Sequence, residues 1–160
     1  MNYAEEIGKI LLDKNLTIST CESCTGGLLS SRLTDVSGSS AYIRLNLVTY
    51  ANEAKEKMLN VSNKTLVEHG AVSEQCAYEM AKGLHFLTNS DICVSTTGIA
   101  GPTGGSLEKP VGLMYSAIYT PKIYKIYKIN IDSNLSRIEI KERFAEEVLK
   151  NIYEFLLNAI

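Results

Sequence analysis

Helical and strand-like patterns alternate along this 160-residue chain, and this alternation constrains its fold more than any other feature. Helical patterning covers residues 3–14, 28–33, 52–59 and 62–69. A further helical segment begins after Ser73, which is a good N-cap residue. The last helical segment has an apolar stripe of Ile140, Phe144, Val148, Ile152 and Phe155. Strand-like runs cover residues 16–21, 41–50, 92–96, 111–119 and 123–131. Since parallel strands need helical crossovers, we predict an α/β fold.

The last two strand-like runs are separated only by Thr120, Pro121 and Lys122, which is typical of an antiparallel hairpin. A chain of this length with 45% apolar residues is long enough for one full core and short for two. We therefore predict a single three-layer α/β/α domain over residues 1–160, with a mixed, mostly parallel sheet. The strand order does not follow from the sequence.

Composition and charge exclude several classes of protein. The formal net charge is −2 and no basic run marks a surface for a nucleic acid backbone, so we expect no nucleic-acid partner. No apolar run approaches the roughly 20 residues of a membrane span, and the first residues lack the basic region of a secretory signal. We expect a cytoplasmic protein without a membrane partner, in which most of the four cysteines remain thiols.

The stretch Cys21-Glu22-Ser23-Cys24-Thr25-Gly26-Gly27 follows a strand-like run and opens a helical one. Such a turn directs unpaired N–H groups and the positive end of the helix dipole toward one point, which suits an anion or an activated nucleophile. Three interpretations are open. The turn is an ordinary helix cap, or Cys21 and Cys24 form a dithiol or half of a zinc site, or Ser23 is a nucleophile.

The other cysteines and the histidines bear on these alternatives. A zinc site needs a second pair of ligands, which neither Cys76 and Cys93 nor the two histidines supply, so zinc is the weakest interpretation. A dithiol is the main alternative to a serine nucleophile. His69 and His85 lie in or at the end of amphipathic helices, so a Ser-His-Asp triad is poorly supported. A serine nucleophile then needs another base, such as a lysine desolvated by burial. Lys55 follows a strand end, although periodicity alone predicts a solvated side chain there.

Five ordered segments carry a resemblance to a known family. They are ESCTGG at 22–27, VTYANEAK at 48–55, HGAVSE at 69–74, TGIAGPTGG at 97–105 and EKPVG at 108–112. In this order and spacing the chain resembles the CinA C-terminal domain family over nearly its whole length. It is similar to short members that lack the molybdopterin-binding-like N-terminal domain of longer ones.

The resemblance implies an α/β/α enzyme that hydrolyses the carboxamide of nicotinamide mononucleotide to nicotinate mononucleotide and ammonia, a step of NAD recycling. It implies a Ser-Lys dyad without metal or cofactor, in which Ser23 matches the nucleophile and Lys55 the base. Tyr50 matches an active-site tyrosine, whose phenol would hold the lysine or relay a proton. The implied partners are the small-molecule nucleotide and a second copy of the chain, as a homodimer.

Substrate-binding residues follow from the same motifs. Backbone N–H groups around residues 24–27 would hold the oxyanion, and the loop 98–105 would hold the 5′-phosphate or else be an ordinary surface loop. Arg137 and Lys141 would add positive charge for the phosphate or else remain solvated. The predicted substrate-binding residues are Glu22, Cys24, Thr25, Gly26, Gly27, Asn52, Gly98, Gly101, Thr103, Gly104, Gly105 and Arg137.

The chain departs from the family pattern at several positions. Cys21 stands where the family usually has alanine, which makes the C-x-x-C spacing the result of one substitution. Asn46 and Leu135 lie in segments that usually contain glycine, and Lys141 stands where a second arginine is common. The differences at Asn46 and Leu135 motivate the alternative function, a catalytically weak nucleotide-binding or regulatory module that keeps the pocket.

Overall fold

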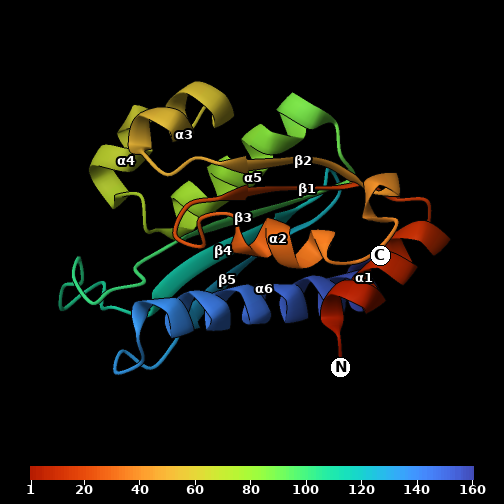
Figure 1. Ribbon diagram of the computed structural model, residues 1–160. Coiled ribbons are helices and arrows are strands. Elements are labelled where there is room, and N and C mark those ends of the chain that lie inside the picture. Colours follow the sequence, from red (N-terminus) through yellow and green to blue (C-terminus); the bar gives the residue numbers. More distant parts are fainter.

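The computed structural model describes all of residues 1–160 and contains one five-stranded sheet (Figure 1). The strands are β1 (Ile18–Glu22), β2 (Ile43–Val48), β3 (Ile92–Gly98), β4 (Leu113–Tyr119) and β5 (Tyr124–Asn130). Their order is β2-β1-β3-β4-β5, with β1 parallel to β2 and β3, and β4 antiparallel to β3 and β5. Only β4 runs against the other strands, which confirms the predicted mixed, mostly parallel sheet and its hairpin.

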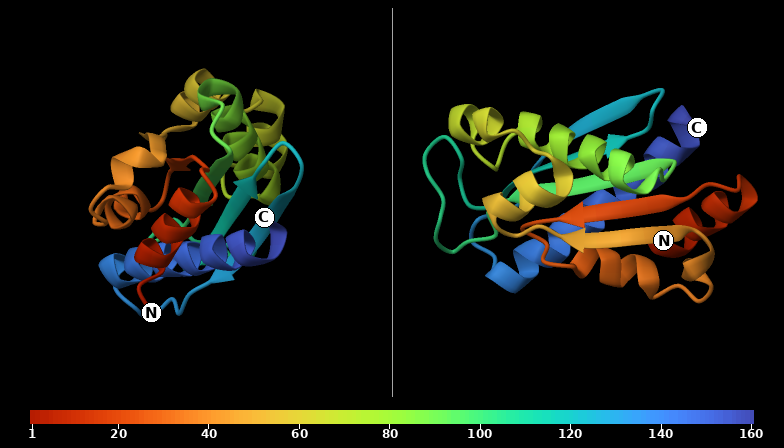
Figure 2. Two further views of the ribbon diagram at one scale, coloured as in Figure 1. Left: turned by 90° about the vertical axis from the view of Figure 1, so that its right-hand side faces the viewer. Right: turned by 90° about the horizontal axis from the view of Figure 1, so that it is seen from above.

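Helices cover both faces of the sheet, which gives the three predicted layers (Figures 1 and 2). One face carries α1 (Tyr3–Asp13), α2 (Leu28–Thr34) and α6 (Arg137–Ala159), and the other carries α3 (Asn52–Leu59), α4 (Asn63–His69) and α5 (Glu74–Thr88). A 3-10 turn over Ser39–Ala41 leads into β2. The predicted cap Ser73 accepts a hydrogen bond from the N–H of Cys76 in the first turn of α5. No helix is long and apolar enough to cross a membrane.

Each face of the sheet has its own hydrophobic core. The larger core lies between the sheet and α1, α2 and α6, and includes Ile7, Leu29 and Phe144. The smaller core lies under α3 and α5. The buried residues of α5 recur at helical spacing, as Cys76, Ala77, Met80, Ala81 and Leu84. Helix α5 is thus fixed to the sheet by its whole inner face and supports α3.

Helix α3 approaches α5 closely at Gly83. A Cβ atom at Gly83 would lie 1.8 Å from the carbonyl oxygen of Leu59, at the end of α3, so only glycine allows this approach. Lys55 lies about one turn before Leu59 in the same helix. The contact therefore fixes the position of that lysine relative to the sheet.

The connections that follow β1, β2 and β3 leave the same end of the sheet, on the left in Figure 1. They are the turn 23–27, the β2–α3 connection 49–51 and the loop 99–112, and the first turn of α6 lies at this end as well. Ligands of open α/β sheets bind at the carboxyl ends of parallel strands. The topology therefore points to this end of the sheet as the location of a site.

Candidate active site

Ser23 and Lys55, which are 32 residues apart in sequence, meet at this end of the sheet. Ser23 follows β1, and its N–H donates to the carbonyl oxygen of Thr96 in β3 at 3.1 Å. The Nζ of Lys55 lies 3.1 Å from Ser23 Oγ. The same nitrogen donates to the carbonyl oxygens of Thr49 at 2.9 Å and Tyr50 at 3.1 Å. The structure thus brings the predicted nucleophile and the predicted base into hydrogen-bond contact.

The surroundings of Lys55 favour its neutral amine. The residue is 1% exposed and takes part in none of the ion pairs of the protein. Burial lowers the pKa of Lys55 from the ordinary value of 10.5, against a weaker opposite effect of the neighbouring thiols. A neutral amine has two N–H donors and one lone pair. The two carbonyl oxygens accept the donors, which leaves the lone pair for the hydroxyl proton of Ser23.

Glu22, next to Ser23, is fully buried. Its Oε1 accepts hydrogen bonds from Thr25 Oγ1 at 2.6 Å and from the N–H groups of Gly27 and Leu29 at 3.2 and 2.9 Å. Its Oε2 accepts from the N–H of Ser30 at 2.9 Å and from the hydroxyl of the same residue. The carboxylate fills the N-terminus of α2, a placement that differs from the substrate contact predicted for Glu22.

The turn leaves two N–H groups free beside Ser23. The N–H of Gly26 donates to the carbonyl oxygen of Ser23, and that of Gly27 donates to Glu22. No hydrogen bond within the protein uses the N–H of Cys24 or of Thr25. Both N–H groups therefore have no acceptor within the protein; Cys24 is 6% exposed and Thr25 is fully buried.

The cysteines of the turn are not activated. Cys21 and Cys24 are free and buried. Burial raises the pKa of Cys24 from 9.0 to about 12 and holds the pKa of Cys21 well above 9.0. Because the thiolate is the reactive form of cysteine, both are poor nucleophiles near neutral pH. The structure thus favours Ser23 over the dithiol interpretation.

Tyr50 contacts Lys55 through its main chain and not through its phenol. The side chain is exposed, and its hydroxyl accepts a hydrogen bond from Nη2 of Arg137 at 3.2 Å. Nη1 of Arg137 donates to the carbonyl oxygen of Gly101 at 2.6 Å. Arg137 therefore links α6 to the β2–α3 connection and to the loop 99–112.

A cavity of about 390 Å³ lies against the turn 23–27. It is lined by Thr25, Gly26, Gly27, Leu28, Ser31, Ile138, Lys141 and Glu142. The Nζ of Lys141 lies 3.5 Å from the position of a Cβ atom built on Gly26, which places a cation beside the turn. Sequence motifs point to the turn and to Lys141, but no sequence signal points to Ser31 or Ile138.

The glycine-rich loop after β3 borders a different cavity, of about 550 Å³. This cavity is lined by Pro102, Thr103, Gly104, Gly105, Ser106, Leu107, Pro110, Val111 and Ser133. No lysine or arginine is among them. A Cβ atom at Gly98 would lie 2.7 Å from the carbonyl oxygen of Leu113, and one at Gly105 would lie 2.8 Å from the nitrogen of Val111. Close packing therefore accounts for these two glycines without a bound phosphate.

Asn52 and Asn46 lie in different surroundings. Asn52 is the first residue of α3 and is exposed. Asn46 accepts a hydrogen bond on its side-chain oxygen from Thr20 Oγ1 at 2.8 Å, between β1 and β2. The side chain of Asn46 is thus bound to the sheet and does not line the cavity beside the turn.

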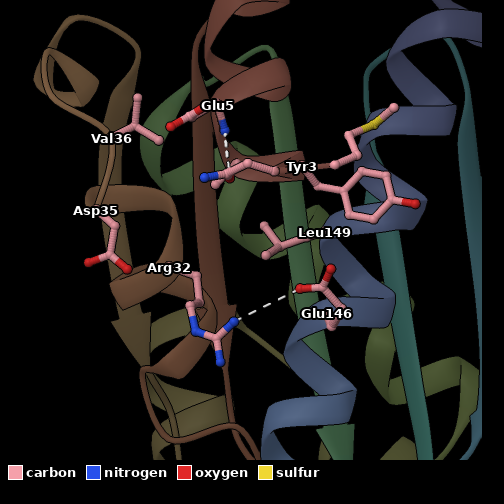
Figure 3. Close-up of a pocket in the computed structure, with 10 residues that line it drawn as sticks. Tyr3, Glu5, Arg32, Asp35, Val36, Glu146 and Leu149 are labelled. Carbon is pink, nitrogen blue, oxygen red and sulfur yellow. Dashed lines mark hydrogen bonds and ion pairs between the residues drawn. The ribbon is translucent and has the colours of Figure 1, made fainter.

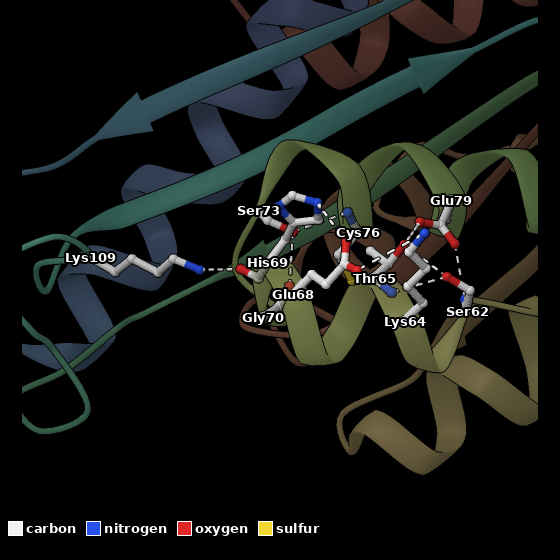
Figure 4. Close-up of polar contacts among 10 residues, drawn as sticks. All are labelled: Ser62, Lys64, Thr65, Glu68, His69, Gly70, Ser73, Cys76, Glu79 and Lys109. Carbon is white, nitrogen blue, oxygen red and sulfur yellow. Dashed lines mark hydrogen bonds and ion pairs between the residues drawn. The ribbon is translucent and has the colours of Figure 1, made fainter.

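The two histidines lie apart from the dyad. His69 ends α4, where the amine of Lys109 donates to its carbonyl oxygen (Figure 4). His85 is hydrogen-bonded through Nδ1 to the carbonyl oxygen of Ser90 at 2.9 Å. No group of three or more histidine, cysteine, aspartate or glutamate side chains is placed to hold a metal ion. Neither histidine contacts Ser23, so Lys55 is the base within reach of its hydroxyl.

Another cavity, of about 450 Å³, lies beside the N-terminus of α1, the end of α2 and the middle of α6 (Figure 3). An ion pair of 3.9 Å between Arg32 and Glu146 lies along it. Its lining includes no serine, cysteine or histidine. Neither this cavity nor the one against the turn 23–27 is lined by Ser23 or Lys55, but Thr25, two residues after Ser23, lines the latter.

Comparisons with known proteins give matches over nearly the whole chain. The model of the CinA C-terminal domain family matches residues 1–156. A putative competence-damage inducible protein of Caldanaerobacter subterraneus subsp. tengcongensis is 50% identical over 137 residues, which cover 86% of this chain and 33% of that protein. A CinA-like protein of Chloroherpeton thalassium is 48% identical over 163 residues, which cover 99% of this chain and 38% of that protein. The chain thus spans 33% and 38% of the length of these two curated relatives.

Solved structures share the fold. The competence/damage inducible protein CihA from Agrobacterium tumefaciens is 38% identical with a TM-score of 0.88, and the match covers 95% of this chain and 94% of that one. The competence damage-inducible protein A (ComA) from Klebsiella pneumoniae subsp. pneumoniae is 29% identical with a TM-score of 0.93, covering 98% and 96%. Sequence and structure agree, and the chain belongs to the CinA C-terminal domain family.

Proposed function

We propose that this protein is an amidohydrolase that converts nicotinamide mononucleotide to nicotinate mononucleotide and ammonia, with Ser23 as the nucleophile and Lys55 as the base. The observation that carries the proposal is a buried lysine without an ionic partner, 3.1 Å from a serine hydroxyl. A neutral lysine accepts the proton of a hydroxyl, which is the task of the base beside a serine nucleophile.

In the first step, Oγ of Ser23 attacks the amide carbon while its proton moves to Nζ of Lys55. The N–H groups of Cys24 and Thr25 stabilise the charge that develops on the amide oxygen; one such donor contributes about 3 kcal/mol in a known hydrolase. The protonated Lys55 then gives its proton to the amide nitrogen as the C–N bond breaks. Ammonia leaves, and an ester remains on Ser23.

In the second step, water attacks the ester carbon and Lys55 accepts a proton from the water. The C–O bond to Ser23 breaks, and Oγ takes this proton back from Lys55. The carbonyl oxygens of Thr49 and Tyr50 hold Nζ in place throughout. The amine must be neutral at the start of each step, which the lowered pKa of Lys55 favours.

The cavity against the turn supports a nucleotide as the substrate. Lys141 places one cation at its border, and Arg137, one turn earlier in α6, places another near Tyr50. Both can pair with a phosphate. Ile138 adds exposed apolar surface on which a pyridine ring can pack. Free nicotinamide would use neither cation, so the proposal requires that the phosphate contribute to binding.

An ammonia-release assay tests the proposal. We expect release from nicotinamide mononucleotide by the wild type, a much lower kcat/KM with free nicotinamide, and a loss of at least about 10³-fold in Ser23→Ala. Ser106→Ala, in the loop 99–112, is the matched control and retains the rate. Absence of release from the wild type would leave a binding module as the function. Release that Ser23→Ala does not affect would refute the dyad.

A further inference from the structure

The side chain of Glu22 holds the turn that carries Ser23. Its carboxylate accepts five hydrogen bonds, two of them from hydroxyls and three from the backbone at the start of α2. Helix α2 has Gly27 at its N-cap position and therefore no side-chain cap of its own. Glu22 supplies this cap from the preceding strand, and no ion pair neutralises it.

The turn is tied to β3 through the same carboxylate. Thr25 Oγ1 lies 2.6 Å from Glu22 Oε1 and 2.8 Å from Thr96 Oγ1. The carbonyl oxygen of Thr96 in turn accepts the N–H of Ser23. The position of the Ser23 backbone therefore depends on a continuous set of bonds that begins at the Glu22 carboxylate.

The main chain of Glu22 holds the other half of the dyad. Its carbonyl oxygen accepts the N–H of Thr49 at 2.8 Å. The carbonyl oxygen of Thr49 accepts a hydrogen bond from Nζ of Lys55 at 2.9 Å. Glu22 is thus bonded to both sides of the dyad, to the serine side by its carboxylate and to the lysine side by its backbone.

We propose that Glu22 is a positioning residue, whose buried carboxylate sets the distance between Ser23 and Lys55 and leaves the N–H groups of Cys24 and Thr25 as the oxyanion donors. It does not touch the substrate. This role rests on the dyad of the proposed function, and it predicts an effect on the chemical step and not on substrate binding.

Glu22→Gln tests the role, because the new amide group would face the N–H of Ser30 as donor against donor. A displacement of about 1 Å can cost 10²-fold in rate, so we expect kcat for nicotinamide mononucleotide to fall on the order of 10²-fold with KM within about twofold. Thr25→Val keeps the carboxylate but removes the hydroxyl that joins it to Thr96, and it is expected to lower kcat in the same way.

A fluorophosphonate gives a second readout that needs no turnover of the nucleotide. It forms an Oγ–P bond on an activated serine with release of fluoride, and peptide mass mapping locates it. We expect labelling of Ser23 to slow in Glu22→Gln and Thr25→Val by about the same factor as kcat. Asn2→Ala, which removes the cap of α1 at the other end of the fold, is the matched control and is expected to keep the wild-type labelling rate.

The outcomes separate the two proposals. Wild-type labelling rates in the folded Glu22→Gln and Thr25→Val proteins, checked by circular dichroism, would overturn the positioning role. If Glu22→Gln does not fold, the rate of Thr25→Val decides. Slow labelling in both variants, with no ammonia release by the wild type, would refute the substrate while supporting the role of Glu22. A wild type that the probe does not label would overturn the activated Ser23 and the positioning role together.

Discussion

The amine of Lys55 lies 3.1 Å from the hydroxyl of Ser23, and its two other polar neighbours are carbonyl oxygens, which can only accept hydrogen bonds. The two carbonyl oxygens can accept both N–H groups of a neutral amine, and its lone pair then faces the hydroxyl of Ser23. A charged amine would have no carboxylate to offset its burial. Burial without an ionic partner lowers the pKa of Lys55, which is the direction that a base requires.

The pH dependence of catalysis follows from the lowered pKa of Lys55. The neutral amine is the active form, so kcat/KM should rise with pH, about tenfold per unit, and level off above the lysine pKa in the free enzyme. Because burial lowers that pKa from 10.5, the plateau should begin below pH 10.5. Steady-state rates in overlapping buffers measure the profile. A flat profile from about pH 6 to 10 would count against Lys55 as the base, provided that binding and chemistry limit the rate.

The burial of Lys55 also lowers the free energy of unfolding of the protein. Between its lowered folded pKa and 10.5 the unfolded chain binds more protons, so the free energy of unfolding rises with pH across this interval. Lys55→Met should therefore be more stable than the wild type near neutral pH, by about 1.4 kcal/mol for each unit of pKa lowering, and the gain should shrink as pH approaches 10.5.

Urea unfolding at several pH values measures this difference. Lys57→Met, in the same helix, is the control, because the Lys57 side chain is 77% exposed, and it should change stability by less than about 0.5 kcal/mol. A Lys55→Met protein that is less stable than the wild type at neutral pH would show that the amine is not destabilised by burial.

Gly83→Ala should disturb both stability and catalysis. The added methyl group would overlap the carbonyl oxygen of Leu59, so α3 and α5 must separate, at a cost of about 2 kcal/mol or more. Because α3 carries Lys55, we expect kcat to fall as well. Thermal unfolding and initial rates measure the two effects, with Lys82→Ala as the control on the same helix. Wild-type values in Gly83→Ala would contradict the close approach.

Arg137 and Tyr50 should respond differently to substitution. Arg137→Ala loses the hydrogen bonds to Gly101 and Tyr50 together with a cation near the cavity, so KM for nicotinamide mononucleotide should rise about tenfold or more. Tyr50→Phe keeps the carbonyl oxygen that holds Lys55 and should leave kcat within about threefold. Steady-state kinetics separates these effects. A large loss of kcat in Tyr50→Phe would instead place the phenol in the proton transfer.

Local patterns predicted the elements of the fold well. The apolar stripe of α6, the cap Ser73 of α5 and the hairpin of β4 and β5 depend on residues close in sequence, and the structure confirms them. The strand order depends on which strands pair after the crossovers, which no local pattern encodes. The parallel pairing of β1 with both β2 and β3 therefore appears only in the structure.

The sequence predicted the parts of the candidate site that lie in one continuous motif. The turn with Ser23 shows its strand-to-helix character in sequence, whereas periodicity makes Lys55 a solvated residue. Its burial arises because the connection 49–51 brings α3 back over the end of β1, a tertiary effect. The structural role of Glu22 had a signal, since α2 starts at a glycine without a side-chain cap and needs an acceptor from elsewhere. Ile138 reaches the cavity from α6, and nothing in its spacing relates it to the turn.

Rapid acid quench during turnover of nicotinamide mononucleotide, followed by peptide mass mapping, tests the roles of Ser23 and Lys55 most directly. The dyad predicts an acyl group derived from the substrate on Ser23 in the wild type, and none in Ser23→Ala or Lys55→Met. An acyl group on Cys24 instead, or unchanged turnover in Ser23→Ala, would contradict it.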